Sequence, residues 1–278
     1  MESLKSFIEN GTLPNRLVCI DRMNEWNPDA LYPFALDELL CERAAAWQTG
    51  FLHIWRHPGA LIMGLRDSRL PGARQAMDML RARGFSAVVR NSGGAAVPLD
   101  LGVVNISLVL PKRQDGALDF RGDFELMYRL IAGALAHFDS DVDKGEIAGS
   151  YCPGDYDVSI GGRKFCGLAQ RRRQHAYAVQ AFVVVEGGGA ERAALARDFY
   201  RIAADGASAD RFPAVEQGRM ASLSELLAPM TALQFADSFA ALLQRGGVSL
   251  EPAEAGALAA EAEVSSIMAA LKERYPVL

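Results

Sequence analysis

The chain has 278 residues, of which 50% are apolar and 23% are charged, and its formal net charge is −5. This size and composition are typical of a globular protein whose core is large enough to be stable without disulfides. The mildly acidic charge gives no overall footprint for nucleic acid or an anionic membrane, and we expect neither as a partner.

The N-terminal segment carries no recognisable targeting signal. Residues 1–17 lack an apolar core and a small-residue cleavage site, unlike a signal peptide. The longest apolar stretch, residues 176–185, has about half the length of a membrane span and contains Gln180. We therefore expect a cytoplasmic protein with reduced thiols at Cys19, Cys41, Cys152 and Cys166. No pair of cysteines has C-x-x-C spacing and the histidines add no H-x3-5-H pattern, so we expect no metal site.

In chain order, strand-like and helix-like patterns alternate over the first two thirds of the sequence. The expected strands are residues 16–20, 51–57, 60–64, 86–90 and 103–110. The expected helices are residues 33–47, 73–84 and 123–138, and the second of these ends at Gly84 as a C-cap. After Gly189 the chain is predicted to be helical almost throughout, with breaks at Pro213, Pro229 and Pro252.

These elements predict a single α+β domain over residues 1–278, in which helices flank a mixed sheet. The core of the domain is expected at about residues 1–200 and a helical C-terminal segment at about residues 201–278. No stretch of the sequence resembles a flexible linker between domains. Three residues in apolar parts of the predicted elements are expected to be core residues: Cys19, Cys41 and His137.

A glycine-rich loop follows the predicted strand that ends at Arg90. Gly93 and Gly94 allow a turn in which several backbone N–H groups point into one concavity, which is suited to holding a carbonyl, carboxylate or phosphate group. The loop is neither G-x-G-x-x-G nor a Walker loop, and no helix is predicted to follow it. Asp100 after the loop and Asn105 within the next, apolar strand favour a binding site. The alternative is a tight turn, with Asn105 and Ser107 merely satisfying backbone groups of the loop.

The stretch "SYCPGDYDVSIGGRKFCGLAQRRR", residues 150–173, places Cys152 in a Cys-Pro-Gly turn and Lys164 beyond a Gly-Gly pair. Cys152 is either a packing residue or a thiolate nucleophile with a cationic neighbour. Cys166 lies within a predicted strand and is expected to be structural. The basic run at residues 171–173 is either a solvated face or a docking site for an acidic partner.

The nucleophile hypothesis makes a geometric demand on this stretch. Gly161 and Gly162 predict a two-residue β-hairpin in which Ser159 lies opposite Lys164. Cys152 is seven residues before Ser159, which is about 23 Å along a straight strand. The hypothesis therefore requires the chain to fold back at residues 153–154, so that Cys152 and Lys164 converge.

Two motifs, "RNSGGAAVPLDLGVVNIS" at residues 90–107 and "SYCPGDYDVSIGGRKFCGLAQR" at residues 150–171, resemble a known superfamily. It is the lipoate/biotin protein ligase superfamily, which groups lipoate–protein ligases, octanoyltransferases and biotin ligases. The resemblance covers most of the chain but not the segment after about Gly189. It implies a biotin/lipoate protein ligase-like catalytic domain, which is similar to that of class II synthetases.

The resemblance also implies roles for individual residues. Cys152 would be the nucleophile that forms an acyl thioester, and Lys164 the cation that favours its thiolate. The residues implied to bind the acyl group or its carbonyl are Arg90, Asn91, Ser92, Gly93, Gly94, Asp100, Asn105, Gly167 and Gln170. The residues that line the acyl slot itself are not implied.

Within the superfamily, the chain is most similar to the amidotransferase branch. Members of that branch move an octanoyl group from a lysine of the glycine cleavage H protein to a lysine of the lipoyl domains of 2-oxo-acid dehydrogenase E2 subunits, without ATP or another cofactor. Ligases and carrier-protein-dependent octanoyltransferases usually have a His-Asp pair where this chain has Leu99-Asp100. The alternatives are an ATP-dependent lipoate–protein ligase, an octanoyltransferase that uses acyl carrier protein, and a non-catalytic binder of lipoyl domains.

Overall fold

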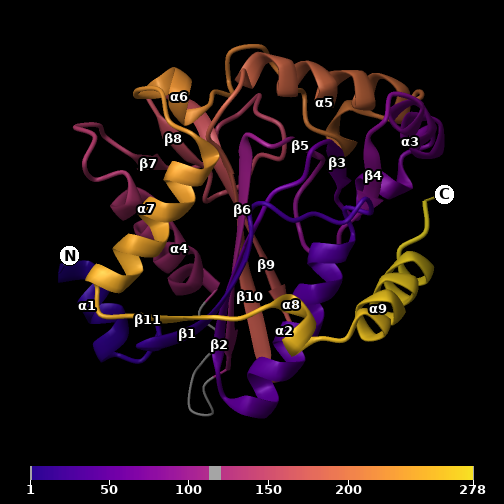
Figure 1. The fold of residues 1–278 in the computed structure, drawn as a ribbon. Helices are drawn as coiled ribbons and strands as arrows, with labels where there is room; N and C mark the ends of the chain where they lie inside the picture. Colours follow the sequence, from indigo (N-terminus) through magenta and orange to yellow (C-terminus); the bar gives the residue numbers. More distant parts are fainter. Residues whose placement is uncertain (1, 113–119, 278) are drawn as a thin grey trace.

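The computed structural model describes residues 2–112 and 120–277, whose strands form two sheets (Figure 1). The larger sheet has eight strands in the order β11-β1-β2-β6-β10-β9-β8-β7, and the smaller has three in the order β4-β3-β5. The expected α+β class with a mixed sheet is confirmed. The strands predicted at residues 60–64 and 86–90 are also present, but they form a sheet of their own instead of joining the larger one.

In the larger sheet, β1 pairs in parallel with β2 and β11, and the remaining neighbours pair antiparallel. In the smaller sheet, β3 is parallel to β4 and antiparallel to β5. The strands are β1 (Arg16–Arg22), β2 (Gly50–Trp55), β3 (Ala60–Met63), β4 (Ser86–Val89), β5 (Val97–Leu99), β6 (Val103–Pro111), β7 (Asp143–Lys144), β8 (Val158–Ile160), β9 (Arg163–Arg172), β10 (Ala176–Val184) and β11 (Ser249–Pro252).

Helices cover both faces of the larger sheet: α4 and α7 lie on one face, and α2 lies on the other with α9 packed against it. Helices α3 and α5 cover the smaller sheet along the top of Figure 1. The helices are α1 (Glu2–Glu9), α2 (Tyr32–Trp47), α3 (Ala73–Ala82), α4 (Phe120–Ala134), α5 (Gly189–Ala203), α6 (Leu223–Leu226), α7 (Ala232–Arg245), α8 (Ala255–Leu258) and α9 (Glu261–Arg274).

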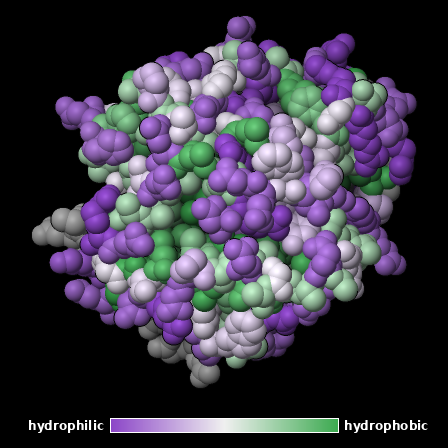
Figure 2. All heavy atoms as spheres, viewed as in Figure 1, coloured by the Kyte–Doolittle hydropathy of each residue, from purple (hydrophilic) through white to green (hydrophobic). Residues whose placement is uncertain are grey.

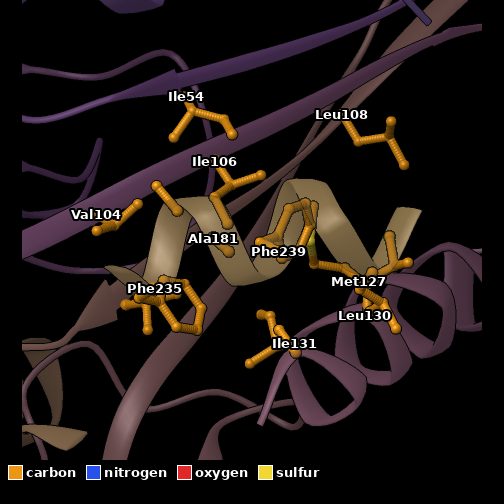
Figure 3. Close-up of a cluster of buried hydrophobic side chains, with 14 of the residues drawn as sticks. Ile54, Val104, Ile106, Leu108, Met127, Leu130, Ile131, Ala181, Phe235 and Phe239 are labelled. Atoms are coloured by element: carbon orange, nitrogen blue, oxygen red, sulfur yellow. The ribbon is translucent and has the colours of Figure 1, made fainter. Parts of the chain in front are cut away.

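Strands β6 and β10 are buried on both faces, since α4 and α7 cover one face of the larger sheet and α2 covers the other. Figure 3 shows Phe235 and Phe239 of α7 pointing between the sheet and α4. The other labelled side chains of this core are Ile54, Val104, Ile106, Leu108, Met127, Leu130, Ile131 and Ala181.

Helix α2 is the central helix of the second core. It begins with a proline in its first turn and is apolar on nearly all sides. Its side chains pack with the face of the larger sheet that carries Trp55 and Phe182, and with Ile62 and Val88 of the smaller sheet. Two acidic residues, Asp37 and Glu38, are nevertheless buried in it, with 2% and 3% of their surface exposed. Buried charged groups need partners, and both helix residues have them in the site described below.

Three expectations about individual elements are wrong. Helix α4 ends at Ala134 instead of residue 138, so His137 lies in an exposed turn and not in the core. The C-terminal segment includes strand β11, which pairs with β1, and residues 212–221 are not helical. The helices expected in this segment are confirmed, since α7 contributes to the core in Figure 3 and α9 packs on α2.

Cys41 and Cys166 are buried, in different cores, and Cys19 is half-buried against the core that contains Cys166. On the face shown in Figure 2, hydrophilic side chains dominate the outline and apolar ones form small scattered patches. Among the described residues, no helix has the length and apolarity needed to span a membrane. The apolar stretch at residues 176–185 forms β10, a central strand of the larger sheet.

Candidate active site

The loop that carries Cys152 folds back as the nucleophile hypothesis requires. The amide of Asp157 donates to the carbonyl of Gly154 at 3.0 Å, which closes a turn directly after Cys152. Cys152 itself has a φ of +50°. This left-handed conformation costs a residue with a side chain about 1–2 kcal/mol. Next to it, Tyr151 is fully buried and stacks on Phe182 at 5.9 Å. Surrounding contacts must therefore hold Cys152 in place.

Lys164 supplies the main contacts that hold this loop. The hairpin predicted at residues 161–162 is confirmed with Ser159 opposite Lys164. The lysine side chain is fully buried, and its Nζ donates to the carbonyls of Cys152 at 2.6 Å and Tyr151 at 3.1 Å. It also forms an ion pair with Asp157 Oδ1 at 2.7 Å. Three partners use all three N–H groups of the ammonium. Cys152 and Lys164 thus converge, but at the cysteine backbone.

The contacts to the sulfur come from the glycine-rich loop. Arg90 Nη2 lies 3.3 Å from Cys152 Sγ, and the backbone N–H of Ala95 donates to Sγ at 3.1 Å. The guanidinium is held by the carbonyls of Gly93 and Ala95, at 3.0 Å and 2.9 Å. A cation and a backbone N–H are the partners that a thiolate requires. The cation in contact with the sulfur is therefore Arg90, which the sequence placed among the carbonyl-binding residues.

The remaining thiols lie in surroundings that disfavour ionisation. Burial, with a smaller contribution from Asp21, raises the pKa of Cys19 to about 11. Burial also raises the pKa of Cys41 and of Cys166 well above the ordinary value of a thiol. Cys152 is the only one of the four to accept hydrogen bonds from a guanidinium and a backbone amide among the contacts that the structure describes. It is the thiol suited to nucleophilic chemistry.

Gly94 is the loop residue whose lack of a side chain matters most. Its φ is +96°, and a Cβ at this position would lie 2.6 Å from Cys152 Sγ and closer still to Arg90 Nη2. Helix α5 holds the end of this loop through Tyr200. The Tyr200 hydroxyl accepts from the Ala96 amide at 2.9 Å and donates to Asp67 at 3.0 Å. Sequence analysis missed both Tyr200 and Asp67, since they are 133 residues apart.

A narrow slot opens beside Cys152, between helix α2 and strands β6, β9 and β10. Its cavity volume is about 40 Å³, so the side chains that line it must move apart before it can hold an acyl chain. Its apolar lining includes Phe34, Trp55, Ile62, Val97, Leu99 and Phe182. Four predicted site residues line it with Cys152: Arg90, Ser92, Asn105 and Gly167. At Gly167 a Cβ would clash with the Phe182 ring, so glycine allows this ring to pack against β9.

A second hollow lies on the outer side of the glycine-rich loop. Ser92, Gly93, Gly94 and Pro153 line it, together with residues of the segment around Phe212. Ser92 lines both hollows, and its buried hydroxyl has no hydrogen-bond partner in the described part of the chain. The slot and this outer hollow thus flank the glycine-rich loop next to Cys152, and a substrate held in both would have its reacting carbonyl near the sulfur.

Three of the residues predicted to bind the acyl group or its carbonyl lie outside these hollows. Asp100 forms a bidentate ion pair with Arg192 of α5, at 2.6 Å and 2.8 Å, because the chain after β5 turns towards that helix. Gln170 donates to the carbonyl of Phe120 at the start of α4, on the sheet face opposite the slot. Side chains alternate along β9, which directs Gln170 away from the face of its neighbour Ala169, a slot residue.

Asn91, the third of these residues, belongs to a buried ionic cluster around Glu38. Its Nδ2 donates to Glu38 Oε1 at 2.6 Å. Arg171 and Arg173 of the basic run also bind Glu38, while Arg172 binds Asp123 of α4. The run is therefore committed to ion pairs with two helices. This corrects the interpretation of the run as a solvated face.

The charges and donors of the site are suited to nucleophilic chemistry at a cysteine. A half-buried thiol with a guanidinium and an amide N–H on its sulfur sits at the head of a narrow, mostly apolar slot. In residues 2–112 and 120–277, no group of three or more His, Cys, Asp and Glu side chains is placed to hold a metal ion.

Comparisons with known proteins agree with this geometry. Residues 29–244 match the family model of the lipoyl protein ligase A/B catalytic domain. An octanoyl-[GcvH]:protein N-octanoyltransferase from Geobacillus kaustophilus is 45% identical over 201 residues, which cover 72% of this chain and 71% of that protein. A protein of the same name from Exiguobacterium sibiricum is 44% identical over 71% of this chain and 72% of its own length.

Solved structures share the fold at low sequence identity. A lipoate-protein ligase A bound with ATP has a TM-score of 0.67 at 17% identity, covering 93% of this chain and 94% of that one. A bipartite lipoate protein ligase from Thermoplasma acidophilum has a TM-score of 0.65 at 18% identity, covering 93% and 92%. These likenesses confirm the expected lipoate ligase-like fold.

Proposed function

The chain belongs to the lipoyl protein ligase A/B catalytic domain family, and we propose that within this family it is an octanoyl-[GcvH]:protein N-octanoyltransferase. The observation that carries the proposal is the position of Cys152 Sγ. It accepts hydrogen bonds from Arg90 and from the Ala95 amide at the head of a narrow, mostly apolar slot. A ligase that activates its acyl group as an adenylate has no need of a nucleophile there.

In the first half of the reaction, the Cys152 thiolate attacks the carbonyl carbon of an octanoyl-lysine amide on the glycine cleavage H protein. The C–S bond forms, the C–N bond breaks, and the lysine leaves as an amine after taking up a proton. The octanoyl chain occupies the slot, and the glycine-rich loop lies next to the reacting carbonyl, where N–H donors stabilise the tetrahedral oxyanion.

In the second half, a lysine of an acceptor lipoyl domain attacks the thioester. A new C–N bond forms, the C–S bond breaks, the attacking amine loses a proton, and Cys152 returns as the thiolate. We propose the lipoyl domains of 2-oxo-acid dehydrogenase E2 subunits as acceptors. Because an amide is converted into another amide, the overall free-energy change is small and the proposed reaction requires neither ATP nor another cofactor.

Lys164 acts in this reaction as a positioning residue. Its ammonium has three partners and no exposed surface, so it has no free N–H to donate to the leaving lysine. By binding the carbonyls of Tyr151 and Cys152 it holds the cysteine in its left-handed conformation.

A donor comparison tests the proposed function. The protein is incubated with an apo lipoyl domain and one of three donors: octanoylated H protein, octanoylated acyl carrier protein, or free lipoate with ATP. We expect octanoyl transfer from the H protein without ATP, and at least 100-fold slower modification with the other two. Faster modification by lipoate with ATP would make the protein a ligase, and faster transfer from the acyl carrier protein would make it a carrier-protein-dependent octanoyltransferase.

A further inference from the structure

The slot beside Cys152 ends at the same row of residues on three neighbouring strands. Along β10 its lining runs from Phe182 to Gln180 and stops there. Ser107 on β6 and Ala169 on β9, the last lining residues of their strands, are the pairing partners of Gln180. Beyond this row Ala178 is fully buried in the core. Gln180 and its partners therefore form the closed end of the slot.

Asp37 of helix α2 holds the closed end in place through hydrogen bonds. Its carboxyl group accepts hydrogen bonds from Gln180 Nε2 at 2.8 Å and Ser107 Oγ at 2.6 Å. His53 Nδ1 lies 2.8 Å from the other carboxyl oxygen. At most 9% of the surface of any of these four residues is exposed. A cluster with this many partners fixes the rotamer of Gln180, because a change would leave a buried acidic group without its donor.

Two atoms of this cluster, His53 Nε2 and Gln180 Oε1, have no partner among the described residues, and the second belongs to a residue that lines the slot. Gln180 Oε1 is buried and accepts no hydrogen bond from any residue that the structure describes. An alkyl chain that packs against this oxygen gains nothing from it, since a C–H group cannot satisfy an amide oxygen, and water is kept away from it. The slot is thus apolar beside Phe182 and polar at its end.

We propose that Gln180 sets the length of the acyl chain that the protein accepts, a proposal that rests on the proposed function. Along β10, the slot residues Phe182 and Gln180 are two residues apart, which is about 7 Å along a strand. The seven carbons beyond the carbonyl of an octanoyl group extend about 9 Å for C–C bonds of about 1.5 Å. An octanoyl chain on Cys152 therefore places its last carbons against Gln180, and a longer chain meets the fixed amide.

Shortening Gln180 should consequently admit longer chains. The variants Gln180→Ala and Gln180→Ser remove the amide from the end of the slot, and the second keeps a hydroxyl there. Burial of one further methylene favours the longer chain about fourfold, so burial of two favours it about 15-fold. We expect both variants to raise the ratio of decanoyl to octanoyl reactivity by roughly this factor.

The experiment measures the rate of thioester formation on the intact protein by mass spectrometry, with H protein carrying octanoyl, decanoyl or lipoyl groups. Each variant is compared through the ratio of two donors, so that a smaller folded fraction cancels. Gln174→Ala, in the exposed turn between β9 and β10, is the control and should keep the wild-type ratios. Wild type should react at least 10-fold faster with octanoyl than with decanoyl donor.

Several results would overturn the proposal. Wild type could react equally with octanoyl and decanoyl donors, or the ratio could stay unchanged in both Gln180 variants. A change in the lipoyl-to-octanoyl ratio without a change in the decanoyl-to-octanoyl ratio would mean that Gln180 discriminates between substituents on the acyl chain and not between chain lengths. If wild type forms no adduct with any donor while Gln174→Ala is folded, the proposed function itself fails, and the length proposal fails with it.

Discussion

Replacing Lys164 by methionine tests whether the lysine acts on the backbone of the cysteine loop. Methionine keeps most of the aliphatic volume but removes the ammonium that binds Asp157 and the carbonyls of Tyr151 and Cys152. The change leaves the side chain of Asp157, with 2% exposure, without its counter-charge. Lys164→Met therefore breaks a buried ion pair by removing one partner.

Breaking a buried pair in this way typically lowers the free energy of unfolding by 3–5 kcal/mol, because an uncompensated charge stays buried. For a protein of this size, each kcal/mol shifts the melting temperature by about 2–4 °C, so we expect a fall of roughly 10 °C. The double variant Lys164→Met with Asp157→Asn has no unpaired charge and should recover most of this loss. It does not recover the contacts to the carbonyl of Cys152.

The assay combines thermal unfolding with thioester formation from octanoylated H protein. We expect the double variant to approach wild-type stability but to form the thioester at least 100-fold more slowly, as does Lys164→Met alone, because a displacement of about 1 Å is enough for such a loss. A loss of less than 1 kcal/mol in Lys164→Met would refute the buried ion pair. Near-normal thioester formation in the double variant would refute the positioning role.

Three further predictions concern the loop and the buried cluster. Gly94→Ala should abolish thioester formation with little loss of fold, since its Cβ would occupy the space beside Cys152 Sγ, and circular dichroism provides the control. Arg90→Met removes an N–H donor to the sulfur and should slow thioester formation about 10–100-fold, measured by stopped reactions at neutral pH. Burial raises the pKa of Glu38, but two arginines outweigh it and lower the pKa overall, so its stabilising effect is present above about pH 4.3 and lost below it. The difference in unfolding free energy between wild type and Glu38→Gln should shrink as the pH falls through that value, and a constant difference would contradict this assignment.

The local features of the fold could be predicted from the sequence. The register of the hairpin at residues 161–162 follows from the turn type alone, because a Gly-Gly pair fixes which residues face each other. Strands β5 and β11 could not be predicted, since each has three or four residues and contains a proline. Both are edge strands, where proline is tolerated, and their pairing is provided by distant parts of the chain.

The same distinction holds for the site. The sequence identified Cys152, Lys164 and the glycine-rich loop, because their residue types are unusual in a turn and a strand. It did not identify which cation meets the sulfur, since Arg90 is 62 residues from Cys152 and only the packing of the loop on the cysteine turn brings them together. Asp157 was also missed, although it is the counter-charge of a fully buried lysine.

The most direct test of the proposed mechanism is intact-protein mass spectrometry after mixing the protein with octanoylated H protein in the absence of ATP. We predict an octanoyl adduct that hydroxylamine removes, that is missing in Cys152→Ala and that persists in Cys19→Ala. An adduct that survives in Cys152→Ala, or no adduct on wild type while lipoate and ATP modify a lipoyl domain, would contradict a thioester on Cys152.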